Sequence, residues 1–174
     1  MEILKTNLED VLIIKPTVFP DSRGFFLETY NKARYQDFGI PVTFVQDNHS
    51  RSSKGVLRGL HFQINNPQGK LVSCLRGSVF DVAVDINPNS PNYGEYFGIE
   101  LSEHNQYQLW IPPGYAHGFY VLSDIADFNY KCTDYYFPGD QGGIIWNDKL
   151  INIEWPSKNP ILSEKDSRNP GLEE

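Results

Sequence analysis

Short runs of β-branched and aromatic residues, each closed by turn-forming residues, follow one another along most of this chain of 174 residues. The turns are marked by segments such as Asn65-Asn66-Pro67 and Pro112-Pro113-Gly114. Many short strands at this spacing are typical of a sandwich, a barrel or a jelly roll. We therefore predict an all-β fold with strands at Val11–Ile14, Phe25–Tyr30, Val42–Val45, Val56–Phe62, Leu71–Leu75, Val79–Ile86, Tyr96–Leu101, Tyr107–Ile111, Gly118–Leu122 and Phe128–Tyr136.

Helix signals are scarce. The segment Asn31–Phe38 precedes Gly39, which is a common helix stop, so it predicts one short helix. A second helical turn is expected near Ser163–Ser167. From Leu150 onward the chain is rich in proline and is expected to wrap the domain as a tail. Because no repeat, low-complexity tract or linker is visible, we predict a single domain, residues 1–174.

The composition excludes several classes of protein. A hydrophobic content of 40% fits a globular chain, and a formal net charge of -7 argues against a nucleic-acid or anionic-membrane surface. A local basic pocket for a phosphorylated ligand is compatible with that charge. The first residues hold no apolar core of signal-peptide length, and no run could span a bilayer, so we expect a cytoplasmic protein. Cys74 and Cys132 lie in apolar strand-like segments and predict buried thiols rather than a disulfide.

The stretch Gln46–Gln63 is unusually polar, with two histidines, two arginines, one carboxylate and three amides. Polar groups at this density are costly in a plain core strand, whereas a strand that lines a polar cavity needs them. His61 is the residue best suited to proton transfer, since imidazole titrates near neutral pH. A hydrogen-bonded structural histidine is the other interpretation.

Whether Arg58, His61 and Lys70 meet in one cavity depends on where their strands direct the side chains. Arg58 and His61 lie three apart and would face opposite sides of a regular strand, so we predict a bulge at Gly59 that turns both toward one cavity. Lys70 opens the next strand, where its ammonium either enters the cavity or stays solvated at the edge.

Two carboxylates share one face of the run Val79–Ile86. Asp81 and Asp85 alternate with apolar residues that belong to the core, so the aspartate face is expected to meet solvent or a polar cavity. Either carboxylate is then in a position to pair with Lys70 or with an arginine.

His117 ends the segment PPGYAH, which matches the second sequence motif of cupins, small β-barrel proteins whose histidines often bind a metal. The first cupin motif needs two histidines one residue apart, followed by a glutamate. Phe62 and Gln63 follow His61 instead, so the set of metal ligands is incomplete and we predict no metal.

Tyr130 and Tyr136 have the same strand parity within Phe128–Tyr136 and are predicted to face one cavity, where a phenol can donate a proton or stack on a base. Packed core tyrosines are the alternative. Near the end, Ser163 and Asp166 have the spacing of a capping box. The functional interpretation is that Asp166 orients His61 as a His–Asp pair.

Taken together, these segments resemble the dTDP-4-dehydrorhamnose 3,5-epimerase family, the dTDP-sugar epimerases of the cupin type. The matching segments run through nearly the whole chain: RGFFLETY (Arg23–Tyr30), Gln46–Gln63, QGKLVSC (Gln68–Cys74), DVAVDI (Asp81–Ile86), IPPGYAHGF (Ile111–Phe119), Tyr130–Tyr136, WND (Trp146–Asp148) and LSEKD (Leu162–Asp166). The resemblance implies a cupin-like jelly roll, a homodimer, and catalysis without a metal or any other cofactor.

The resemblance also implies a reaction. The substrate would be dTDP-4-dehydro-6-deoxy-D-glucose, whose C3 and C5 centres are inverted through an enolate to give dTDP-4-dehydro-L-rhamnose. By position, His61 resembles the base, Asp166 its orienting partner, Tyr130 the proton donor and Lys70 the group that stabilises the enolate oxygen. Positioned proton transfer contributes about 10²–10⁴ in rate and one oxyanion contact about 10²–10³, so the site needs all of them.

The remaining family positions imply contacts with the nucleotide diphosphate. These are Arg23, Arg58 and Lys165 at the pyrophosphate; Glu28, Gln46, Asp47 and Asn48 at the base or sugar; His117 at the sugar end; and Tyr136 stacked on thymine. In this family Arg23 and Glu28 can reach the site of the neighbouring subunit. Gln141 is a departure, because relatives commonly carry a glutamate there that touches the ligand.

Three alternatives stay open at the level of the sequence. The first is a relative that inverts C3 only, or a keto-isomerase, acting on a related nucleotide 4-keto-sugar. The second is a metal-dependent cupin. The third is a non-catalytic sugar-nucleotide binding module, which would keep the arginines but would not need His61, Lys70 and Tyr130 together.

Overall fold

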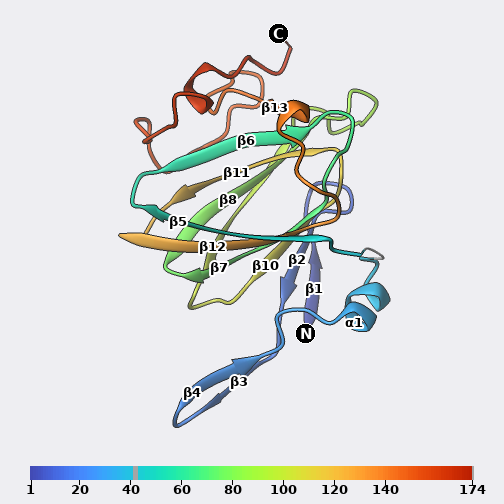
Figure 1. Cartoon of the computed structure of the whole chain (residues 1–174), viewed down its shortest axis with the longest axis vertical. Helices are drawn as coiled ribbons and strands as arrows, with labels where there is room; N and C mark the ends of the chain where they lie inside the picture. Colours follow the sequence, from blue (N-terminus) through green and yellow to red (C-terminus); the bar gives the residue numbers. More distant parts are fainter. Residues whose placement is uncertain (41–42, 174) are drawn as a thin grey trace.

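The computed structural model describes residues 1–40 and 43–173, and most of its strands form two antiparallel sheets packed as a sandwich (Figure 1). Two further strands, β3 (Val18–Asp21) and β4 (Gly24–Leu27), pair only with each other as a separate antiparallel hairpin. The first sheet has the order β1 (Glu2–Lys5), β2 (Leu12–Lys15), β10 (Gln108–Ile111), β7 (Lys70–Arg76), β12 (Ile125–Cys132) and β5 (Gln46–Ser53). The second has the order β13 (Gln141–Gly143), β6 (Leu57–Gln63), β11 (Tyr115–Val121), β8 (Ser78–Asp85) and β9 (Tyr96–Ser102). The predicted all-β architecture is confirmed.

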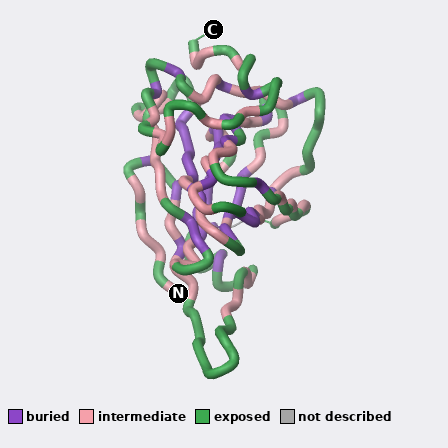
Figure 2. The backbone as a smooth tube through the Cα atoms, turned by 90° about the vertical axis from the view of Figure 1, so that its left-hand side faces the viewer, coloured by how far each residue is buried: buried purple, intermediate pink, exposed green. Residues whose placement is uncertain are grey.

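The main core lies between the two sheets, as the purple segments of Figure 2 indicate. Val72, Leu109 and Phe128 come from the first sheet and meet Phe119 and Val121 from the second. Fully burying one such side chain contributes about 1.5–3 kcal/mol. This packing fixes the spacing of the sheets and therefore the width of any cavity between them.

The C-terminal tail covers the outer face of the second sheet, at the end of the molecule opposite the β3–β4 hairpin (Figure 1). Ile151 and the partly buried Trp155 pack in one cluster with Val82 and Val84 of β8. Both faces of β8 are therefore buried, so the tail prediction is confirmed and the aspartate face of this strand lies inside the sandwich rather than in solvent.

The predicted helix is also confirmed. Helix α1 (Lys32–Asp37) begins after Asn31, whose side chain accepts a hydrogen bond from the Arg34 N–H, and ends before Gly39 at φ +84°. Its Tyr35 packs with Trp110 and Ile14 on the outer face of the first sheet. The other helical segments are single 3₁₀ turns, η1 (Pro138–Asp140) and η2 (Asp166–Arg168).

Several strand boundaries differ from the predicted ones. The strands β1, β5 and β13 and the hairpin strand β3 (Val18–Asp21) had no predicted counterpart, and β4 (Gly24–Leu27) ends before Tyr30. Of the predicted run Val42–Val45, Val42 lies outside the described residues and the rest is not a strand. β12 ends at Cys132, so the run predicted to reach Tyr136 stops early.

Cys74 and Cys132 are buried free thiols, as predicted. None of the helices in the described part of the chain has the length and apolar character needed to pass through a bilayer.

Candidate active site

A cavity of about 460 Å³ is lined by residues of β6, β11, β7, β12 and β5 and by the C-terminal tail. It brings together all the residues predicted for catalysis and part of the predicted nucleotide set: His61, Lys70, Tyr130, Asp166, Arg58, His117, Tyr136, Gln141 and Lys165. Residues more than a hundred positions apart in the chain meet there, because the tail returns to the start of β6. Ile161 forms a parallel bridge with Val56 and brings the following turn over the cavity.

The His61 and Asp166 side chains form a direct pair. The distance from His61 Nε2 to Asp166 Oδ1 is 2.6 Å, and Asp166 is almost fully buried in the turn η2. Burial alone would raise the pKa of Asp166, but the hydrogen bond and charge of His61 and the Gly59 N–H outweigh it, so the pKa lies below its usual value. Asp166 is therefore ionised at neutral pH, and His61 Nε2 carries the hydrogen.

The two interpretations of the Ser163 and Asp166 spacing both describe part of the structure. The Ser163 hydroxyl accepts a hydrogen bond from the Asp166 N–H at 3.0 Å, which is one half of a capping box. The Asp166 carboxylate does not complete the box and instead turns to His61.

The predicted bulge in β6 is confirmed. His61 pairs with His117 and Arg58 with Phe119, so two residues of β6 stand opposite one residue of β11. Gly59 has a φ of +125°, and a Cβ there would lie 2.5 Å from the Gly118 Cα, so only glycine fits. Because of this extra residue, Arg58 and His61 line the same cavity.

The Lys70 side chain enters the cavity, so the solvated-edge alternative is wrong. The residue is 8% exposed, and its Nζ has one long hydrogen bond, to the His61 carbonyl at 3.5 Å. Burial lowers the pKa of Lys70, while the nearby Cys132 and Asp81 act in the opposite direction. The ammonium is thus held beside the His61 backbone, which is its one hydrogen-bond partner among the described residues.

The predicted pairing of Asp81 or Asp85 with Lys70 or an arginine is wrong. Asp81 is fully buried and its Oδ2 lies 2.8 Å from His117 Nε2, whereas Asp85 accepts hydrogen bonds from Ser90 and Asn87 in the following turn. Asp81 lies inside the sandwich and Asp85 at the strand end, so their contacts differ although they share one face.

His117 forms a second imidazole–carboxylate pair, directly opposite His61 in the β6–β11 register. Burial lowers the pKa of His117, Asp81 opposes this, and the charges of Lys70 and His61 lower it further. The ring stacks on Phe128 with centroids 5.9 Å apart. His117 is therefore a rigid, neutral imidazole at the inner end of the cavity.

The two tyrosines line the same cavity, but the parity argument for them is wrong, because β12 ends at Cys132 and Tyr136 lies in the loop beyond. Burial and the neighbouring Cys132 raise the pKa of Tyr130, so its phenol stays protonated at neutral pH. Tyr136 is half exposed, and its hydroxyl donates to Gln141 Oε1 at 2.8 Å.

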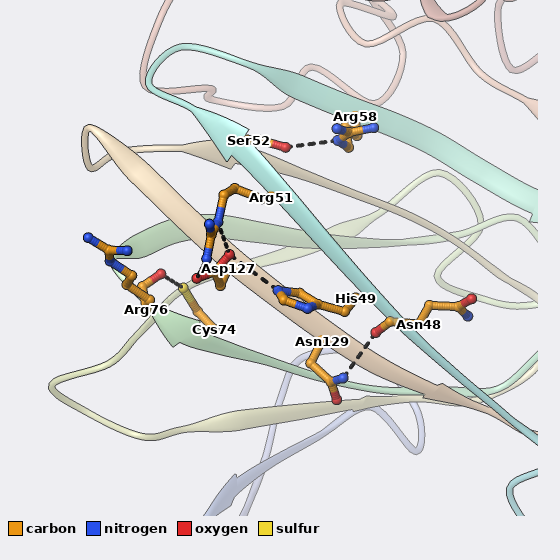
Figure 3. A network of polar contacts seen from close by, with 9 residues as sticks. All are labelled: Asn48, His49, Arg51, Ser52, Arg58, Cys74, Arg76, Asp127 and Asn129. Atoms are coloured by element: carbon orange, nitrogen blue, oxygen red, sulfur yellow. Dashed lines mark hydrogen bonds and ion pairs between the residues drawn. The ribbon is translucent and has the colours of Figure 1, made fainter.

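The cations of the cavity are bound to neutral oxygens. Arg58 Nε donates to Ser52 Oγ at 3.0 Å, which Figure 3 shows, and Lys165 Nζ donates to Gln141 Oε1 at 2.7 Å. Within residues 1–40 and 43–173, neither these two side chains nor Lys70 form an ion pair with a carboxylate. Their positive charges therefore remain available to an anionic ligand.

The predicted residues Gln46, Asp47 and Asn48 do not line the cavity of this chain. The Gln46 amide accepts from the Tyr136 N–H at 2.9 Å and donates to Asn48 Oδ1 at 3.1 Å. The Asn48 amide in turn donates to Cys132 Sγ, and Asp47 pairs with Lys131 on the outer face.

Arg23 and Glu28 also lie away from the cavity. Arg23 is in the hairpin of β3 and β4 and contacts Asp21 at 2.6 Å, whereas Glu28 contacts Arg34 at 3.2 Å. In Figure 1 this hairpin extends away from the sandwich, at the end opposite the C-terminus.

Some polar residues at the site were not predicted. Ser50 lines the cavity and Ser52 contacts Arg58. Gln63 donates to the carbonyls of Asn66 and Tyr135 and accepts from the Phe137 N–H. The alternation of serines in β5 was the available signal, because every second residue of a strand faces the same side.

No group of three or more His, Cys, Asp or Glu side chains in the described ranges, 1–40 and 43–173, is arranged to hold a metal ion. The two histidines of the cavity each bind a carboxylate through Nε2 instead.

The fold and the cavity define a cupin-type enzyme with acid–base groups beside a cationic rim. A family model described as dTDP-4-dehydrorhamnose 3,5-epimerase matches residues 5–174. The dTDP-4-dehydrorhamnose 3,5-epimerase of Escherichia coli (strain K12) is 57% identical over 177 residues, covering 100% of this chain and 96% of that protein.

Two solved structures are similar to this chain over nearly its whole length and indicate the same family. The dTDP-6-deoxy-D-glucose-3,5-epimerase from Legionella pneumophila Philadelphia 1, in complex with dTDP-4-keto-L-rhamnose, is 51% identical with a TM-score of 0.97, covering 99% of this chain and 93% of that chain. The dTDP-4-dehydrorhamnose 3,5-epimerase from Bacillus anthracis str. Ames, with TDP and PPi bound, is 42% identical with a TM-score of 0.95, covering 98% of each chain. The chain belongs to the dTDP-4-dehydrorhamnose 3,5-epimerase family, and the predicted cupin-type fold and epimerase activity, that of an isomerase, are confirmed.

Proposed function

We propose that the cavity converts dTDP-4-dehydro-6-deoxy-D-glucose to dTDP-4-dehydro-L-rhamnose by inverting C3 and C5 through an enolate, without a cofactor. The C4 ketone acidifies the hydrogens on both neighbouring carbons. Inversion then requires a base on one face of the sugar, an acid on the other and a cation beside the C4 oxygen. The observation that carries the proposal is the 2.6 Å contact between His61 and Asp166 in the same cavity as Lys70 and Tyr130.

His61 acts as the base in this proposal. Since its Nε2 donates to the ionised Asp166, the Nδ1 lone pair is the atom that accepts a proton from the sugar carbon. The electron pair of the broken C–H bond moves toward the C4 oxygen, where negative charge develops. Asp166 holds the ring in the required tautomer and stabilises the imidazolium that forms.

Lys70 and Tyr130 complete the step. The Lys70 ammonium is buried and lacks a carboxylate partner in the described structure, so the developing enolate oxygen would be its strongest acceptor. Tyr130 returns a proton to the opposite face of the carbon, and its raised pKa keeps this proton available before the step.

The nucleotide end of the ligand would lie against the cationic rim. Arg58 and Lys165 would contact the diphosphate, and the half-exposed Tyr136 ring would stack on thymine. His117 would contact the sugar end. Gln46 would contribute indirectly, because it holds the backbone of Tyr136. The ligands of the Legionella and Bacillus relatives, a dTDP-keto-sugar and TDP with PPi, support a thymidine diphosphate sugar as the class of ligand.

We further propose a homodimer in which the hairpin of β3 and β4 reaches the partner's site. The hairpin exposes Phe19, Phe25 and Phe26, the last at 69%, and it stands clear of the sandwich (Figure 2). Apolar side chains exposed at this density are typical of an interface. Arg23, at the tip, would then add a cation to the neighbouring cavity, and Glu28 a hydrogen-bond acceptor.

Complementation tests the shared site. Arg23→Ala and His61→Ala chains should each be nearly inactive alone, and a mixture refolded together should regain activity, because the heterodimer contains one intact site. Sedimentation should give a dimer. A mixture as inactive as its components would contradict the shared site.

Deuterium incorporation tests the reaction. The protein is incubated with the 4-keto substrate in D₂O, and the label is located by NMR. Label at C3 and C5 supports the proposal, label at C3 only supports the 3-epimerase alternative, and no label with intact substrate contradicts both. His61→Ala should abolish exchange while dTDP still binds. Tyr130→Phe should keep part of the exchange but impair correct inversion at C5.

A further inference from the structure

The strand β5 presents two adjacent serines to opposite faces of its sheet. Ser52 is 7% exposed and points inward, whereas Ser53 is exposed on the outer face. The Ser52 hydroxyl oxygen accepts a hydrogen bond from Arg58 Nε at 3.0 Å. Figure 3 shows this contact and, on the same strand, Arg51 turned away toward Asp127.

The contact with Ser52 fixes the orientation of the Arg58 guanidinium. Guanidinium is a planar fork, so once Nε is bound the directions of both Nη groups are set as well. No other side-chain partner of Arg58 is found among the described residues. A hydroxyl also leaves the full positive charge on the arginine, whereas a carboxylate at the same place would neutralise it.

We infer that Ser52 is a positioning residue, which aims the Arg58 guanidinium so that its Nη groups bind the ligand's diphosphate as a bidentate pair. This inference rests on the proposed function, because it takes the diphosphate as the partner of Arg58. Arginine otherwise samples many rotamers, and a side chain that is ordered before binding loses less entropy when the ligand arrives. Ser52 acts on binding through Arg58 and takes no part in proton transfer.

The test is a set of variants measured for dTDP affinity by calorimetry and for kcat and KM with the 4-keto substrate. Ser52→Ala should raise the Kd for dTDP and the KM about three- to tenfold, as expected for one hydrogen bond that orients a charged group, with kcat changed less than about twofold. Ser53→Ala is the matched control and should bind as the unaltered chain does.

Two variants of equal shape distinguish the effect of the Ser52 hydroxyl on binding from the effect of packing at this position. Ser52→Thr keeps a hydroxyl and should retain affinity, whereas Ser52→Val has the same shape without it and should bind as weakly as Ser52→Ala. Thermal melts identify any variant that does not fold, and the Thr and Val comparison then decides the question. Equal affinity of the two folded variants would overturn the inference.

A double-variant cycle tests whether Ser52 acts through Arg58. Arg58→Ala should weaken dTDP binding at least as much as Ser52→Ala, and Ser52→Ala should add no further loss in the Arg58→Ala background. A full additional loss would overturn the positioning role. If Arg58→Ala itself left dTDP binding unchanged, the proposed diphosphate contact would be wrong as well. If Arg58→Ala weakened dTDP binding and Ser52→Ala did not, the inference about Ser52 would be wrong while the proposed diphosphate contact would stand.

Discussion

The pair formed by His61 and Asp166 gives the sharpest test of the mechanism, through Asp166→Asn. The contact is 2.6 Å long and Asp166 is almost fully buried, and the amide of asparagine would occupy the place of the carboxylate. The amide would donate its own hydrogen to His61 Nε2, which moves the imidazole hydrogen to Nδ1 and blocks the proposed basic atom. A comparable change in a Ser-His-Asp triad lowers kcat about 10⁴-fold, and positioned bases contribute about 10²–10⁴.

We therefore expect Asp166→Asn to lower kcat about 10²- to 10⁴-fold and to change the Kd for dTDP less than about threefold. The assay is the rate of deuterium incorporation at C3 and C5, together with calorimetry for dTDP. Asp148→Asn is the control, because Asp148 is also a buried carboxylate that anchors the tail, through the backbone N–H groups of Ile151 and Leu172. That variant should lower the melting temperature with little effect on kcat. A kcat for Asp166→Asn within about twofold of the unaltered chain would refute the role of the pair.

Three further predictions concern pH and stability. Burial lowers the pKa of Lys70 below the ordinary 10.5, so kcat should fall as the pH rises through that lowered value. In Lys70→Arg the remaining activity should persist to higher pH, because arginine keeps its charge. Gly59→Ala should destabilise the fold by about 1–3 kcal/mol in urea titrations, because φ is +125° there. Gly139→Ala is the control and should leave the stability nearly unchanged, because nothing lies within 4 Å of the added Cβ. The Arg51 hydrogen bonds lower the pKa of Asp127 to about 2 against the effect of burial. The stability from this pair is complete above about pH 3.8, the ordinary value, and is lost as the pH falls toward 2, so Asp127→Asn should flatten the acid dependence of unfolding in that window.

The fold class could be predicted because short apolar runs separated by turn residues indicate many short strands. The strands that were missed carry no such pattern. β3 contains Pro20 and is exposed throughout, and β13 is three residues long with two glycines, Gly142 and Gly143. β5 is polar because its inward-facing residues contact polar groups: Ser50 lines the cavity, Ser52 accepts from Arg58, and Gln46 donates to Asn48. Apolar periodicity finds strands that face a core and misses strands that face a cavity or stand alone.

The site could be predicted less completely than the fold. The bulge at Gly59 followed from the spacing of Arg58 and His61, and the structure has it. The partner of Asp81 could not be predicted, because β8 and β11 are distant in sequence. Their register sets His117 opposite Ala83, from where its ring reaches Asp81 two residues away on the same face. Gln46 was expected to contact the ligand, yet its amide holds the Tyr136 backbone. Residue type indicates that a polar group has a partner, and only the register decides which partner it has.

The two faces of β5 explain how a chain with a net charge of -7 can present a cationic cavity. On the outer face Arg51 contacts both oxygens of Asp127 at 2.6 and 2.8 Å, so this pair is nearly neutral to its surroundings. On the inner face Arg58 has a serine hydroxyl, which orients the guanidinium without cancelling its charge. An anion is therefore attracted to the inner face, although arginine occurs on both. The sign of the charge in the cavity depends on which cations lack a carboxylate partner, and it cannot be read from the net charge of the chain.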